Sequence, residues 1–134
     1  MRNKTLACIR RWQFIAIISI AAGATSGCTG GRTTPGYAIS TGGDFHRGQQ
    51  VIVQFRCGEC HTIPGIDGAT GVFGPPLNSF ADRTLIAGEF PNIPDHLTNW
   101  IVSPQSMKPK TAMPDLGLSQ QQGRDVAAYL YTLR

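Results

Sequence analysis

The sequence lacks a hydrophobic run as long as a typical membrane-spanning helix, and its body lacks an excess of charge of either sign. Residues 12–24 are mostly apolar, but a spanning helix needs about 20 such residues. Of the 12 Lys and Arg residues, Arg2, Lys4, Arg10 and Arg11 precede this run, so the rest equal the 8 Asp and Glu residues in number. A near-neutral body lacks the basic surface that nucleic-acid binding requires, which excludes that class of partner.

The start of the chain follows the order of an export signal: basic residues, the apolar run, then small residues before Cys28. We therefore expect residues 1–27 to direct export, with an uncleaved single-pass anchor as the alternative. Gly27-Cys28 resembles the cleavage point of bacterial lipoproteins, although Thr25 stands where Leu is usual. This resemblance predicts a lipid on Cys28 and a periplasmic or otherwise extracytoplasmic protein tethered to the membrane. An ordinary cleavage region with an incidental thiol is the alternative.

The rest of the chain divides into a short linker and one domain. Residues 28–43 are rich in Gly, Thr and Ser without a periodic apolar pattern, which predicts a flexible tether. Residues 44–134 form the domain, in which 62–93 and 103–118 are dense in Gly and Pro and are expected to be loops. A domain of this size with so much loop buries little apolar surface, so it needs a staple or a cofactor. We predict a small all-α fold built around a cofactor.

Three helices are predicted in this domain. The first begins at the N-cap Asp44 and carries Gly48 on its apolar face. Because a glycine within a helix costs about 1 kcal/mol, its presence predicts the close approach of another backbone. The second helix covers residues 95–102 between two prolines. The third begins with a capping box at Ser119, carries Tyr129 on its apolar face and is expected to cross the first.

The run Cys57-Gly58-Glu59-Cys60-His61 carries the strongest chemical signal in the sequence. Cys-x-x-Cys-His is the attachment pattern of c-type haem. Two thiols three residues apart lie on one helical turn and can each bond to a vinyl group, while the following imidazole is directed at the iron. We predict one covalent haem c held by Cys57 and Cys60, with His61 as an iron ligand. Export agrees with this, because haem c is attached outside the cytoplasm.

Three other kinds of site use cysteines and histidines in similar spacings. A thioredoxin-like Cys-x-x-Cys requires a βαβ setting, which the pattern of the chain does not indicate. A structural zinc site requires four ligands, and no second Cys pair completes the set. A disulfide between Cys57 and Cys60 suits an oxidising compartment but leaves His61 without a role.

Met113 is the favoured second axial ligand, because it lies in a loop that can fold over the face of the haem opposite His61. Met107 is expected to pack beneath this loop, and His46 and His96 are expected to lie at the surface. A thioether favours ferrous iron and raises the reduction potential. An iron with both axial positions filled by protein suits electron transfer better than catalysis.

These residues together resemble class I cytochrome c over residues 44–134. The order is that of the family: a helix, Cys-x-x-Cys-His, Gly-Pro-x-Leu at 74–77, a middle helix, a Met loop and a closing helix with an aromatic residue. The resemblance implies that the Pro75 carbonyl accepts a hydrogen bond from the His61 ring. It further implies haem contacts by Leu77, Arg83 and Trp100, the last two near the propionates; a solvated loop charge is the alternative for Arg83.

A closer resemblance is to the cytochrome c domain fused to subunit II of some haem-copper oxidases. It is carried by His61-Thr62-Ile63, Trp100-Ile101, Pro104-Gln105-Ser106 and Lys108-Pro109 leading to Met113-Pro114. The copper-binding domain of those subunits has no counterpart here, so we expect the electron-delivering module alone. The resemblance implies a single-electron carrier with redox protein partners, a haem-copper oxidase or a quinol-oxidising complex among them. The alternatives are a haem-bearing subunit of a dehydrogenase, and a haem peroxidase or sensor with a labile sixth ligand.

Overall fold

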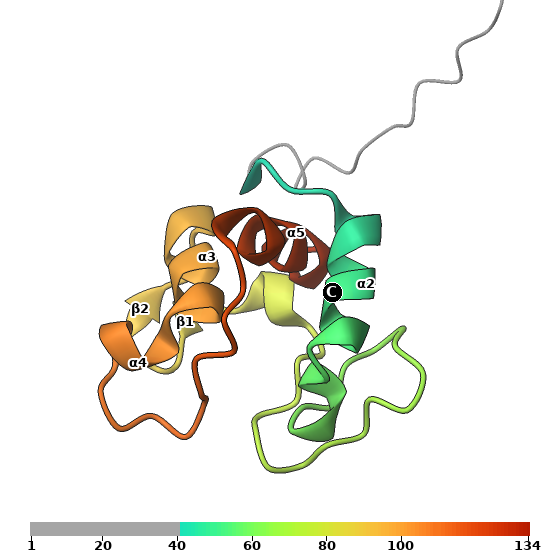
Figure 1. The fold of residues 1–134 in the computed structure, drawn as a ribbon, viewed down its shortest axis with the longest axis horizontal. Coiled ribbons are helices and arrows are strands. Elements are labelled where there is room, and N and C mark those ends of the chain that lie inside the picture. Colours follow the sequence, from blue (N-terminus) through green and yellow to red (C-terminus); the bar gives the residue numbers. More distant parts are fainter. Residues whose placement is uncertain (1–40) are drawn as a thin grey trace, which may run out of the picture. The chain divides into compact units, whose positions relative to one another are not determined.

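The computed structural model describes residues 41–134, so the predictions for the export signal, for Cys28 and for most of the tether lie outside the described residues. Within residues 41–134, no helix is both long and apolar enough to cross a membrane. Figure 1 shows the described elements, which in chain order are α2 (Phe45–Gln54), the 3-10 helices η1 (Cys57–Glu59) and η2 (Phe80–Asp82), β1 (Leu85–Ile86), β2 (Phe90–Pro91), α3 (Pro94–Val102), α4 (Pro104–Met107) and α5 (Gln120–Leu130).

The first and last helices of the domain, α2 and α5, pack directly against each other (Figure 1). The contact is made at Gly48, where a Cβ atom would overlap the backbone carbonyl of Asp125 and meet the Cβ atom of Tyr129 at 3.1 Å. The predicted close approach at this glycine is therefore confirmed. The predicted N-cap and capping box are also present, because the Asp44 carboxylate accepts from the Arg47 N–H and Ser119 exchanges hydrogen bonds with Gln122.

A buried carboxylate links the two helices. Asp125 is 2% exposed and accepts hydrogen bonds from the Asp44 backbone N–H at 2.8 Å, from the Arg47 guanidinium at 2.9 and 3.0 Å, and from the Gln121 amide at 3.0 Å. Burial by itself raises the pKa of Asp125, but these donors and the Arg47 charge outweigh it and hold that pKa below its ordinary value. The carboxylate therefore stays ionised inside the helix crossing.

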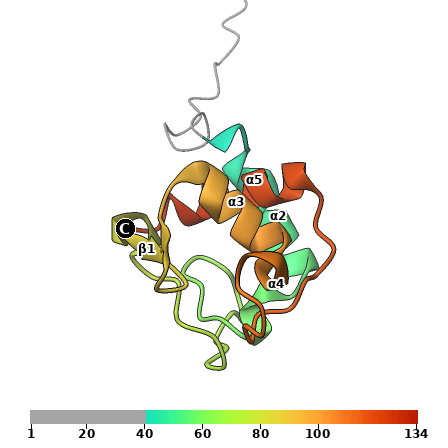
Figure 2. The same cartoon turned by 90° about the vertical axis from the view of Figure 1, so that its left-hand side faces the viewer.

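The middle of the domain matches the prediction of a second helix flanked by prolines. Helix α3 begins with Pro94, packs against α5 and is followed at once by α4, as Figures 1 and 2 show. Its buried Leu97 and Ile101 join Ile52 of α2 and Leu130 of α5 in one hydrophobic core. The mainly helical architecture confirms the predicted class I cytochrome c fold class.

Four short elements, η2, β1, β2 and α4, interrupt the segments that were expected to be loops. Strands β1 and β2 pair antiparallel, with Leu85 opposite Pro91 and Ile86 opposite Phe90. Helix α4 forms a single turn whose first residue is Pro104, a position where proline is favoured. Strands of two residues are too short to show an alternating pattern in the sequence, and one helical turn is too short to show a stripe.

Candidate functional site

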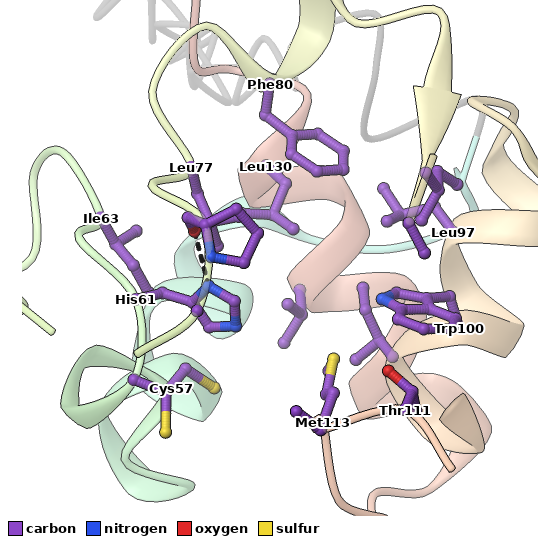
Figure 3. A pocket seen from close by; sticks show the side chains of 18 of the residues that line it. Cys57, His61, Ile63, Leu77, Phe80, Leu97, Trp100, Thr111, Met113 and Leu130 are labelled. Carbon is purple, nitrogen blue, oxygen red and sulfur yellow. Dashed lines mark hydrogen bonds between the residues drawn. The ribbon is translucent and has the colours of Figure 1, made fainter. Parts of the chain in front are cut away.

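A cavity of about 780 Å³ opens between the core and the two long loops, and its lining is mostly apolar. This volume lies within the range of 300–1,000 Å³ that is usual for sites of small molecules and cofactors. Figure 3 shows the side chains that project into it from α3, α5 and the loops. Every residue that the sequence assigned to a cofactor lines this one cavity: Cys57, Cys60, His61, Pro75, Leu77, Arg83, Trp100 and Met113.

The two cysteines and His61 share a single turn. Helix α2 ends before Arg56, whose left-handed backbone (φ 58°) starts the separate 3-10 turn η1. The backbone N–H groups of Cys60 and His61 both donate to the Cys57 carbonyl, at 3.3 and 3.0 Å. No disulfide joins Cys57 and Cys60, and burial raises the pKa of the Cys57 thiol. The turn therefore directs two sulfurs and one imidazole to the same cavity.

The His61 ring is oriented by the segment that follows the turn. Its Nδ1 atom lies 2.7 Å from the Pro75 carbonyl oxygen (Figure 3). A carbonyl can only accept a hydrogen bond, so Nδ1 is the donor, and Nε2 is the ring nitrogen that could bind a metal. Gly74 lies against the ring: a Cβ there would overlap Cε1 and lie 2.7 Å from Nδ1. The ring thus occupies space that only a glycine leaves open.

Residues 57–77, which we name the His61 wall, are joined by three backbone hydrogen bonds from residues 71–77 to residues 58–62. The N–H of Gly71 donates to Gly58, that of Gly74 to Cys60 and that of Leu77 to Thr62, at 3.0, 2.7 and 2.8 Å. The Thr62 hydroxyl adds a bond of 3.0 Å to the Gly71 carbonyl. The position of His61 is consequently set mainly by main-chain contacts.

Residues 108–116, which we name the Met113 wall, close the opposite side of the cavity. In Figure 3 the Met113 side chain extends towards the interior from the side opposite His61, near Trp100 and Thr111. The Lys108 ammonium group holds the start of this wall to the β1–β2 turn, through the Ala87 carbonyl at 3.2 Å and Glu89 at 3.4 Å. The two candidate axial ligands thus come from opposite walls of one cavity.

The alternative candidates for the second axial ligand, Met107, His46 and His96, do not line the cavity. Met107 is the last residue of α4, and His46 lies exposed on α2. His96 lies in the first turn of α3, where its Nδ1 atom is 3.2 Å from the Pro91 carbonyl oxygen. Among residues 41–134, no group of three or more His, Cys, Asp or Glu side chains is arranged to hold a metal ion. The described residues therefore offer no ligand set for a structural zinc site.

Arg83 and Trp100 stand at different parts of the lining. The Arg83 guanidinium donates to the carbonyls of Pro76 and Asn78 and lies 5.1 Å from the centre of the Phe80 ring. The guanidinium is thus held by carbonyls of the same loop. The Trp100 indole packs against Phe90, with the ring centres 6.0 Å apart.

Several lining residues were not identified from the sequence. They share an origin in segments expected to be featureless loop, and they include Phe73, Phe80, Leu85, Ile86, Ala87 and Thr111. No periodic pattern singles them out, because each reaches the cavity through the path of its loop. The hydrophobic character of Phe80 and Ile86 within a loop is the one signal that could have indicated burial.

The comparisons with known proteins match the domain as a whole. The family model described as cytochrome c matches residues 45–134. The chain is also 33% identical over 90 residues to the cytochrome c oxidase subunit 2 of Alkalihalophilus pseudofirmus. That match covers 66% of this chain but 25% of the relative, so the similarity extends over about a quarter of the oxidase subunit.

Proposed function

The chain belongs to the cytochrome c family, whose members carry covalently bound haem c for electron transfer, and we propose that it is a single-electron carrier with one haem ligated by His61 and Met113. In this proposal Cys57 and Cys60 form the two thioether bonds. The haem iron, when bound, supplies a couple that gains or loses one electron. The protein therefore forms and breaks no substrate bonds and is not itself an enzyme.

The observation that carries the proposal is the placement of His61 and Met113 on opposite walls of the cavity that both cysteines also line. The residues present fit a haem in three respects. The lining is mostly apolar, the bond from His61 Nδ1 to Pro75 leaves Nε2 as the ring nitrogen for a metal, and no disulfide joins the two cysteines. The hydrogen bond to Pro75 also increases the basicity of the imidazole and fixes its orientation.

The proposed roles of the remaining lining residues follow from their contacts. Leu77 and Leu130 supply apolar surface that would pack on a flat ring and exclude water. Arg83 and Trp100 carry N–H groups at the lining and would serve the charged edge of the cofactor. With water excluded and both axial positions filled, the residues around the iron need not rearrange when its charge changes.

The test is expression of the full chain in a host that attaches haem c, followed by mass spectrometry and visible spectroscopy. We expect the mass of one haem, added without loss of atoms, and a long-wavelength ferric band typical of thioether ligation. Met113→Leu should abolish that band, whereas Met107→Leu, a matched change outside the cavity, should retain it. A colourless exported protein, or a band that survives Met113→Leu, would refute the proposed ligation.

We further propose that the carrier works outside the cytoplasm, tethered by a lipid on Cys28, and delivers electrons to a terminal oxidase. Support for the partner is the similarity to an oxidase subunit, with a quinol-oxidising complex as the corresponding donor. The same mass spectrum would show the cleavage site and any lipid. Oxidation of the reduced protein by purified haem-copper oxidase, compared with autoxidation alone, tests the partner; equal rates would contradict it.

A further inference from the structure

Gln105 lies outside the cavity lining but contacts the loop that carries Met113. Its side-chain amide donates one hydrogen bond to the Thr111 carbonyl and one to the Met113 carbonyl, both at 2.7 Å. Its own backbone N–H donates to the Asp115 carboxylate at 3.1 Å. Three positions of the Met113 wall are therefore bound to one residue of α4.

From this geometry we infer that Gln105 is the positioning residue that keeps the Met113 thioether over the iron, and so decides how readily another ligand takes the sixth position. The inference rests on the proposed His61 and Met113 ligation and extends it to the stability of that ligation. It assigns Gln105 no contact with the iron. Its action is through the backbone of the Met113 wall.

The amide group suits this task because of its geometry and its lack of charge. An amide NH₂ has two hydrogens, and here each is used by one of two carbonyls that lie two residues apart in the loop. Helix α4 supplies a firm base, because it begins with buried Pro104 and follows α3 directly. Fixing both carbonyls restricts the backbone on either side of Ala112 and thereby the direction of the Met113 side chain.

The Met113 wall has little other support of this kind. The bonds at its start, from Lys108 to Ala87 and Glu89, lie five residues before Met113 and involve partly exposed groups. Exposed ion pairs contribute little to stability. If the two amide bonds are lost, the loop opens more often while α3 and α5 stay packed, and the sixth position becomes accessible.

The experiment compares haem-loaded wild-type protein with Gln105→Met, which keeps the length of the side chain and removes both donors. Free imidazole is titrated against the ferric protein, and loss of the long-wavelength thioether band is followed. We expect imidazole to bind about tenfold more tightly to the variant, since two hydrogen bonds of ordinary net strength are lost. The global unfolding midpoint followed by far-ultraviolet circular dichroism should change far less than the imidazole affinity.

Gln49→Met is the matched control, because Gln49 also donates its amide to a backbone carbonyl, that of Gly65 at 3.2 Å, but on the other side of the domain. It should bind imidazole as wild type does. Equal imidazole affinity in wild type and Gln105→Met would overturn the inference while leaving the ligation intact. A wild-type protein without the thioether band would instead refute the proposed ligation, and the inference with it.

A second measurement covers the case in which Gln105→Met fails to take up haem. In the haem-loaded wild-type protein, nuclear magnetic resonance can follow solvent exchange of the Gln105 side-chain amide protons. Both protons should exchange at least several-fold more slowly than those of the exposed Gln120, because each is donated to a carbonyl. Exchange as fast as that of Gln120 would overturn the inference.

Discussion

The two walls of the cavity present their candidate ligands by different means. The His61 wall is held by main-chain hydrogen bonds and by a glycine pressed against the imidazole. The Met113 wall is held mainly by side chains, Gln105 above all, with Lys108 at its edge. Side-chain contacts can be lost one at a time without unfolding the domain, whereas main-chain pairing is lost only when the segment itself unfolds.

This difference predicts which wall of the cavity is rigid and which can move. The turn that bears the cysteines and His61 follows α2 closely in the chain, and the Met113 wall leads into α5 through residues 117–119. The crossing of α2 and α5 is thus a base that both walls share. We expect changes in the His61 wall to cost folding stability and changes in the Met113 wall to alter ligand exchange.

Gly74→Ala should have the largest effect on folding. The new Cβ would overlap the His61 ring, so the ring or the 71–77 segment must move; overpacking of this kind costs about 3 kcal/mol. Denaturant unfolding and the yield of haem-loaded protein measure the loss. Gly117→Ala is the control, since its Cβ meets nothing and only its φ of 75° opposes the change, at about 1 kcal/mol. Equal losses at both positions would contradict the tight packing of the His61 wall.

Asp125→Asn should weaken the crossing of α2 and α5, which supports both walls. We expect a loss of about 2 kcal/mol of unfolding free energy at neutral pH, because the charge-assisted bonds from Arg47 are weakened. The exposed Asp67→Asn serves as control and should change stability little. Imidazole affinity should stay near that of wild type, because neither wall is altered. A large rise in that affinity would show that the walls are not independent of the crossing.

The same carboxylate predicts how stability depends on pH. The pKa of Asp125 is lower in the folded chain than in the unfolded chain. At acid pH the unfolded state therefore binds more protons than the folded state does. The stabilisation by Asp125 is complete above the ordinary carboxyl pKa of about 3.9 and is lost as pH falls through the folded-state value. Urea unfolding at a series of pH values should therefore show the wild type and Asp125→Asn converging below about pH 4. A constant difference would be inconsistent with this assignment.

Lys108→Met should have the smallest effect and should sharpen the contrast with Gln105. The pair that Lys108 forms with Glu89 is partly exposed, so we expect about 0.5 kcal/mol and at most a threefold change in imidazole affinity. Lys110→Met, two residues further along the same exposed loop, is the matched control. If Lys108→Met raised the imidazole affinity as much as Gln105→Met does, the position of Met113 would depend on Lys108 as much as on the Gln105 amide.

Local sequence patterns were sufficient for the three longer helices, α2, α3 and α5. Asp44, the Ser119 capping box and the prolines around α3 mark helix ends through contacts within a few residues, so their effects are visible in the sequence. Gly48 indicated a close contact without identifying it. The partner, the Asp125 backbone, is distant in the sequence and became known only from the packing of α5.

The sequence by itself determined the turn that we propose for haem attachment, because two thiols and an imidazole within five consecutive residues specify their own geometry. The loop position of Met113 already favoured it over Met107, but only the tertiary structure showed what holds Met113 on the side opposite that turn. The route of the loop from α4 to α5 brings Met113, and not Met107, into the cavity. The bonds from Gln105 that fix this route join residues through space, and no spacing rule in the chain encodes them.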